Sequence, residues 1–281
     1  EELVGELVKD ILSKLPPDFD IEKAQNKFPV LYEESMNQVL CQEMLRYNRL
    51  LSIIRSSLQS LEKAVAGLLV MSSDLEKVFR SMAVGKVPDM WKGKSFPSLK
   101  PLGSYVQELL DRLGLLQGWY EGGAPPVFWI SGFFFTPAFT TAALQNFARK
   151  NNLPIDTVGF DFEMMGMEPS AYPAPPADGI YVHGFFLDGC AWDEGKKELC
   201  ESVPKMLYVP APVIWLKPVL LTDFTEYPCY DCPVYRTAER KGTLATTGHS
   251  TNFLMFVRMP TSRPAHHWVM RAVCMLCSLP E

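Results

Sequence analysis

The sequence has 281 residues, of which 47% are hydrophobic and 21% are charged, a composition that indicates an ordered globular protein and excludes a disordered one. Its formal net charge of −5 and its small basic clusters, such as Arg236 with Arg240 and Lys241, argue against binding of nucleic acid. The strongest apolar runs, residues 64–71 and 127–135, are far shorter than the roughly 20 residues that span a bilayer, and no secretory signal opens the sequence, so we predict a soluble, intracellular protein without a membrane segment.

The start of the sequence and its cysteines indicate the context of the protein. Residue 1 is Glu, and apolar pairs recur at helical spacing from Leu3 onward. We therefore expect that the sequence begins inside a longer polypeptide. There are 7 cysteines, an odd number without the dense spacing of a secreted disulfide scaffold. We expect reduced thiols in a cytosolic or ciliary compartment.

The first half of the sequence has the pattern of amphipathic helices. Asp20 is placed to cap one short helix, and Ser72, followed by Ser73, Asp74 and Glu76, predicts the start of another. Between them, apolar residues recur every three to four positions over about eight turns, which predicts one long helix. The predicted helices cover residues 2–15, 21–27, 32–61, 75–82, 101–116 and 138–150.

The second half has the pattern of short strands separated by connectors rich in proline and glycine, which is typical of a compact sandwich or barrel. We therefore predict an α+β fold, with a helical subdomain over residues 1–153 and an antiparallel β-barrel or sandwich over residues 154–281. The predicted strand runs cover residues 157–162, 180–187, 206–209, 213–216, 252–259 and 268–276.

The aromatic run at residues 128–135 lies between the two predicted halves. Aromatic side chains at this density are more often core than the lining of a ligand pocket. We predict that the run is buried and joins the helical half to the β half.

No catalytic site is predicted for this segment. The Gly-x-x-x-x-Gly-Lys-Ser/Thr loop that cradles nucleotide phosphates is absent from the sequence. His249 beside Ser250, with Asp188 or Asp161, offers the residue types of a hydrolase triad, but no Gly-x-Ser-x-Gly elbow accompanies them. We interpret residues 242–253 as a turn whose hydroxyls and glycines satisfy the backbone.

Two Cys-x-x-Cys pairs raise the alternative of a stand-alone metal, redox or docking module. Cys229 and Cys232 form one pair, and Cys274 and Cys277 form the other. Roughly forty residues separate the pairs, more than in a zinc ribbon, and residues three apart in a strand face opposite sides. The first pair is taken as exposed, without the helix N-terminus that lowers a thiol pKa. We predict no metal ligands and no cofactor in this segment.

Motifs along the whole sequence resemble the C-terminal domain of dynein heavy chains, the axonemal inner-arm type in particular. Cys229, Cys232 and Cys274 depart from the family pattern. The motifs include Tyr47-Asn48-Arg49-Leu50-Leu51, Val127-Phe128-Trp129-Ile130-Ser131-Gly132, His183-Gly184-Phe185, Pro233-Val234-Tyr235-Arg236-Thr237 and His267-Trp268.

The resemblance implies a non-catalytic cap that lies on the AAA+ ring of the same heavy chain. It implies that ATP and Mg bind elsewhere in the parent polypeptide, that microtubules are contacted only through a distant stalk, and that other dynein subunits are partners. The expected location is the axoneme of cilia and flagella, and the expected role is modulation of ATP-driven, minus-end-directed motility. On the long helix, Arg46, Arg49 and Arg55 are the predicted contacts with the ring.

Overall fold

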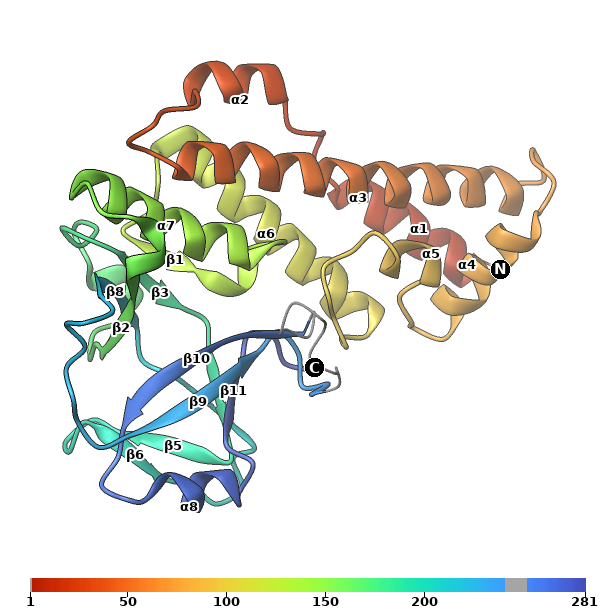
Figure 1. Cartoon of the computed structure of the whole chain (residues 1–281). Coiled ribbons are helices and arrows are strands. Elements are labelled where there is room, and N and C mark those ends of the chain that lie inside the picture. Colours follow the sequence, from red (N-terminus) through yellow and green to blue (C-terminus); the bar gives the residue numbers. More distant parts are fainter. Residues whose placement is uncertain (1, 241–251) are drawn as a thin grey trace.

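The computed structural model describes residues 2–240 and 252–281, and its helices form an elongated layer with the sheets below one end (Figure 1). Helices dominate up to Lys150 and strands dominate after it. The helices are α1 (Glu2–Lys14), α2 (Ile21–Lys27), α3 (Met36–Val65), α4 (Ser73–Ala83), α5 (Asp89–Lys92), α6 (Leu102–Gly122), α7 (Thr136–Lys150) and α8 (Ala265–Val269).

Local signals in the sequence place most of the described helices, although α5 and α8 were not predicted and α6 extends beyond the predicted residue 116 to Gly122. The Asp20 carboxylate accepts a hydrogen bond from the backbone N–H of Lys23 and caps α2, and the Ser72 hydroxyl accepts one from the N–H of Leu75 and caps α4. The 30-residue α3 is the predicted long helix, and it contacts α1, α2, α4, α5, α6 and α7. Its apolar stripe is buried along the whole helix because other helices pack on several sides of it.

The strands form three open sheets. One has the order β1-β3-β8-β2, the second has the order β10-β9-β11-β4-β7, and β5 pairs with β6 as a hairpin. The strands are β1 (Val127–Trp129), β2 (Val158–Met164), β3 (Ile180–His183), β4 (Phe186–Asp188), β5 (Cys190–Asp193), β6 (Glu198–Glu201), β7 (Tyr208–Pro210), β8 (Ile214–Leu220), β9 (Cys229–Tyr235), β10 (Phe253–Pro260) and β11 (Cys274–Leu276).

The structure corrects three details of the predicted fold. The α+β class is confirmed, but the larger sheets are mixed, because β1 pairs with β3 and β11 pairs with β9 in parallel. The described strands do not close into a barrel. The run predicted as a strand over residues 268–276 is also partly wrong, since Trp268 lies in α8 and only its last residues form β11.

One continuous apolar core crosses from the helices to the sheets, from Val4 in α1 to Cys277 after β11. Helix α7 packs on β2 and β8 and connects the two halves. Because the core is shared, the division between residues 153 and 154 stays a prediction. Within the described residues, no helix has the length and apolar character that crossing a membrane requires.

Part of the predicted aromatic core lies at the surface. Phe128 and Phe133 are buried and pack with Phe139, whose ring centroid lies 4.1 Å from that of Phe133. Phe135 is 45% exposed, so its predicted burial is wrong. Its ring instead lies 5.0 Å from the guanidinium carbon of Arg46, a cation–π contact at the start of α7.

Candidate functional site

The three arginines predicted to contact a ring do not share one face of α3. At about 100° per residue, Arg46 and Arg55 lie roughly 180° apart around the helix. Arg46 forms an ion pair with Glu43 at 3.3 Å and stacks on Phe135. Arg55 donates to the Asp18 carboxylate at 2.7 Å and to the Pro16 carbonyl at 2.6 Å. Both side chains therefore have partners inside the domain.

Arg49 differs from the other two arginines in its surroundings. It is exposed on α3, and among the residues that the structure describes it has neither an ion pair nor a hydrogen-bond partner. Of the three predicted residues, Arg49 is the one whose charge is available to another surface.

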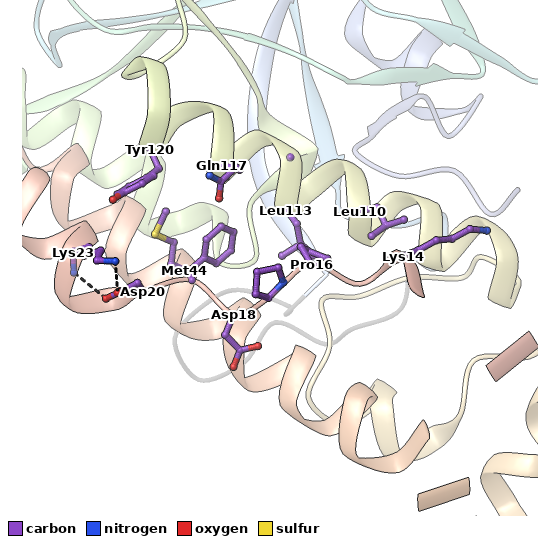
Figure 2. Close-up of a pocket in the computed structure, with 13 residues that line it drawn as sticks. Lys14, Pro16, Asp18, Asp20, Lys23, Met44, Leu110, Leu113, Gln117 and Tyr120 are labelled. Atoms are coloured by element: carbon purple, nitrogen blue, oxygen red, sulfur yellow. Dashed lines mark hydrogen bonds and ion pairs between the residues drawn. The ribbon is translucent and has the colours of Figure 1, made fainter. Parts of the chain in front are cut away.

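A groove of about 730 Å³ opens between α3, α6 and the link from α1 to α2 (Figure 2). Its apolar side is formed by Met44, Leu110 and Leu113, and charged side chains such as Lys14 and Asp18 stand around it. The groove has room for the apolar side chains of a protein partner.

Polar side chains of α3 hold the wall of this groove. Asn48 accepts a hydrogen bond from the N–H of Phe19 at 2.8 Å and donates to the carbonyl of the same residue at 2.9 Å. Arg55 fixes the same link two turns further along the helix through Pro16 and Asp18. In the motif at residues 47–51, Asn48 therefore has a structural role, whereas the neighbouring Arg49 is exposed.

A cluster of buried and half-buried charged and polar side chains, which we call the interlock, joins α3 and α6 to the start of α7. Its members are Glu43, Tyr47, Glu108, Arg112 and Arg236. The Glu43 side chain is fully buried, and its carboxylate accepts hydrogen bonds from the N–H groups of Phe134 at 2.5 Å and Phe135 at 2.9 Å. Burial raises the pKa of Glu43, and the two N–H donors oppose that rise.

Arg112 and Tyr47 bind the same segment from another side. The Tyr47 hydroxyl donates to the Gly132 carbonyl at 2.7 Å and accepts from Arg112 at 3.2 Å, and burial raises the pKa of Tyr47 so that it keeps its proton. Arg112 also donates to the Phe133 carbonyl at 3.3 Å and lies 3.7 Å from the ring centroid of Phe96. Burying this arginine is tolerated because carbonyl, hydroxyl and ring surfaces replace its water.

The interlock also reaches the β half and the last residues of the sequence. Arg236, just after β9, donates to the carbonyls of Phe133 and Phe134, and burial lowers its pKa. Glu108 lies 3.7 Å from Arg112 and accepts a hydrogen bond from Ser278 at 3.1 Å. This cluster was not predicted from the sequence, where its one signal is the presence of Glu43 and Arg112 among the apolar positions of predicted helices.

The glycine motifs of the sequence meet beside the interlock. The Ser131 hydroxyl donates to the Gly184 carbonyl at 3.0 Å. Gly184 has φ of 103°, and a Cβ there would lie 2.5 Å from Cδ1 of Trp129. The two motifs, far apart in sequence, therefore require each other's glycines and small side chains.

The cysteines do not have the surroundings that a metal or redox site needs. Cys232 is fully buried, so the prediction of an exposed first pair is wrong. Burial raises the pKa of Cys274 to about 11 and of Cys277 to about 12, which keeps both thiols protonated at neutral pH. Among residues 2–240 and 252–281, no three His, Cys, Asp or Glu side chains are grouped to hold a metal ion.

The hydrolase alternative falls partly outside the described residues. His249 and Ser250 lie there, as does most of the predicted turn at 242–253. Asp188 forms an ion pair with Arg240, and Asp161 lies 3.5 Å from Arg258. The two proposed carboxylates thus have arginine partners.

Comparisons with known proteins agree with the resemblance in the sequence. Residues 1–277 match the family described as the C-terminal domain of the dynein heavy chain. The protein is 53% identical over 279 residues to human dynein axonemal heavy chain 3, covering 99% of this chain and 7% of that protein. It is 51% identical over 281 residues to human dynein axonemal heavy chain 12, covering 100% of this chain and 9% of that protein. The human dynein axonemal heavy chain 1 is 50% identical over 279 residues, covering 99% of this chain and 6% of that protein.

Proposed function

Because the protein belongs to the family of C-terminal domains of dynein heavy chains, we propose that it is the non-catalytic cap of an axonemal heavy chain. It packs on the AAA+ ring of the same polypeptide and modulates ATP-driven, minus-end-directed movement along microtubules in cilia and flagella. The chain spans less than a tenth of the length of the axonemal relatives it matches. ATP and Mg therefore belong to the remainder of such a heavy chain, which is also the partner of this domain together with other dynein subunits.

The interlock is the observation that supports this proposal. A cap alters the relative movements of ring modules only if it transmits force between its own contacts, and a loosely joined pair of halves would absorb that force. In this domain the fully buried Glu43 and the buried Arg112 bind the same backbone segment that Arg236 binds from the β half. These contacts join the helical layer to the sheets, as a force-transmitting cap requires.

Arg49 is the proposed point of electrostatic contact on α3. It lies on the longest helix and has no ion pair within the described residues. Arg46 and Arg55 have internal roles instead, at Phe135 and at the groove wall. The groove lies on another side of α3, because about 140° separates Met44 from Arg49 around the helix, and it offers a second, apolar surface (Figure 2).

The test compares three forms of the full heavy chain: intact, lacking this domain, and carrying Arg49→Glu. Microtubule gliding and microtubule-stimulated ATPase activity are measured after the fold of the truncated ring has been verified. We expect the truncated form to change velocity or coupling by at least about fivefold, in line with an allosteric coupling of roughly 1 kcal/mol or more. Arg49→Glu is expected to shift the same quantity in the same direction by a smaller amount.

Lys196→Glu is the matched control, because Lys196 is an exposed cation in the turn between β5 and β6. This variant is expected to leave gliding and ATPase activity unchanged. Unchanged motility in the truncated form would refute modulation by the domain. Equal effects of Arg49→Glu and Lys196→Glu would refute the specific role of Arg49.

A further inference from the structure

We infer that the loop between α3 and α4 is a docking surface for the heavy-chain module that precedes this domain in the polypeptide. The inference deepens the proposed function, on which it rests, by naming the surface that anchors the cap. The feature that carries it is an exposed apolar patch, which we call the tip patch: Leu3, Leu68, Leu69, Val70 and Met71.

The tip patch is unusually exposed for apolar side chains. Leu68 is 80% exposed and Val70 is 87% exposed, and Leu69 and Met71 between and beside them are 45% and 40% exposed. Leu3, in the first turn of α1, is 73% exposed. Single exposed apolar residues are ordinary, but four consecutive ones on one loop are the kind of exposed apolar surface on which proteins bind each other, and the inference starts from them.

The loop is held in shape at both ends. At the end of α3, the N–H of Leu68 donates to the Lys63 carbonyl at 2.8 Å and that of Gly67 donates to the Ala64 carbonyl at 3.0 Å. With Gly67 at φ of 73°, this is a Schellman motif, in which the residue after the glycine normally packs back on the helix. Here that residue, Leu68, points to solvent.

The other end of the loop is fixed by the Ser72 cap of α4. A loop held by two caps presents Leu69 and Val70 without losing much conformational freedom when a partner binds. The Schellman motif at Gly67 and the Ser72 cap therefore hold apolar side chains outward, where they do not contribute to this domain's own core.

The occupant follows from where the polypeptide enters the domain. The start of α1 lies beside the end of α3, since a Cβ on Gly5 would be 3.9 Å from Cγ1 of Val65. The N-terminus and the connection between α3 and α4 lie at the same end of the helical layer, away from the sheets (Figure 1). A domain at the C-terminal end of a heavy chain is joined to everything before it at this end.

The family is described as the C-terminal domain of the heavy chain, and the chain covers less than a tenth of its axonemal relatives, so in such a heavy chain the preceding module joins the domain on the side of the tip patch. A covalent connection gives two surfaces a high effective concentration, so a modest apolar contact is sufficient to hold them together. We assign the tip patch to an apolar surface on that module, and neither to a second copy of this chain nor to a separate subunit.

Hydrogen–deuterium exchange tests this assignment. The amides of Leu69, Val70 and Met71 have no backbone hydrogen bond among the described residues, so they are expected to exchange rapidly in the 281-residue protein, which has a core of its own. In the full heavy chain we expect them to exchange at least about tenfold more slowly. The double substitution Leu68→Ser with Val70→Ser is expected to abolish that protection.

Leu207→Ser is the matched control. Leu207 is also a highly exposed leucine, at 68%, but it lies in the β half and not in the tip patch. It is expected to leave the protection of the loop intact. Equal exchange in the full heavy chain and in the isolated domain would overturn the inference. Sedimentation of the isolated domain identifies the other occupant, since self-association abolished by the double substitution would assign the patch to a second copy and also overturn it.

These outcomes are independent of the motility test. If the loop is protected and motility is unchanged without the domain, the docking surface stands and the modulating role fails. If motility changes and the loop is equally exposed in both proteins, the modulating role stands and the docking surface is wrong.

Discussion

Gly132 illustrates how a single position is decided by neighbours that are remote in sequence. The Gly132 carbonyl accepts a hydrogen bond from the Tyr47 hydroxyl. A Cβ added to Gly132 would lie 2.6 Å from Cδ2 of Leu115 and 2.8 Å from Cε3 of Trp129. Gly132→Ala is therefore expected to lower the free energy of unfolding by about 1–3 kcal/mol through overpacking. Urea denaturation of the 281-residue protein measures this change.

Gly118→Ala provides the comparison for that substitution. Gly118 is exposed in α6, and a Cβ there would meet nothing within 4 Å. Replacing a helical glycine with alanine is expected to raise stability by up to about 1 kcal/mol. A similar loss in both variants would mean that steric contact does not explain the effect at Gly132.

At the scale of the element, α3 organises the helical layer through polar side chains as well as its apolar stripe. Asn48→Ala removes both hydrogen bonds to the backbone of Phe19. We expect a loss of about 1–3 kcal/mol in the free energy of unfolding, because two backbone groups lose their partner. Faster hydrogen exchange at Asp18, Phe19 and Asp20 is the local measurement, since these residues line the groove.

Asn37→Ala tests whether that effect belongs to Asn48 alone. Asn37 lies on the same helix and donates one exposed hydrogen bond, to the Pro29 carbonyl. Its replacement is expected to lower the free energy of unfolding by less and to leave exchange at residues 18–20 unchanged. If Asn48→Ala also left that exchange unchanged, the role of Asn48 in holding the groove wall would be rejected.

At the scale of the whole molecule, the interlock makes the helices and sheets depend on each other. Arg112→Met leaves the Glu108 carboxylate buried without its cation and removes the contact with the Phe133 carbonyl. We expect the free energy of unfolding to fall by about 3–5 kcal/mol. Hydrogen exchange is expected to rise in α6 and in β9 together, because Arg236 binds the same segment.

Arg80→Met is the surface counterpart of this change. Its ion pair with Glu76 is largely exposed, with 75% of the arginine side chain accessible, and such pairs contribute only about 0–1 kcal/mol. Faster exchange confined to α6 in Arg112→Met would show that the interlock does not couple the two halves.

Much of the fold was predictable because its signals are local. The caps at Asp20 and Ser72 depend on hydrogen bonds to residues close by in sequence, and the stripe of α3 depends on helical spacing alone. The pairing of strands was not predictable, since β1 and β3 lie side by side although the residues they pair are far apart in sequence. The candidate site shows the same division: the helix that carries Arg46, Arg49 and Arg55 was predictable, but the internal partners of Arg46 and Arg55 were not.

The sequence by itself determined the family, the α+β class and the positions of most helices, because motifs, caps and periodicity are written in neighbouring residues. Only the tertiary structure decided which charges are internal, as with Glu43 and Arg112, and which are available at the surface, as with Arg49. It also decided that Cys232 is buried and that Leu68 and Val70 are not. The physical reason is that burial depends on what packs against a side chain, and that neighbour comes from another part of the sequence.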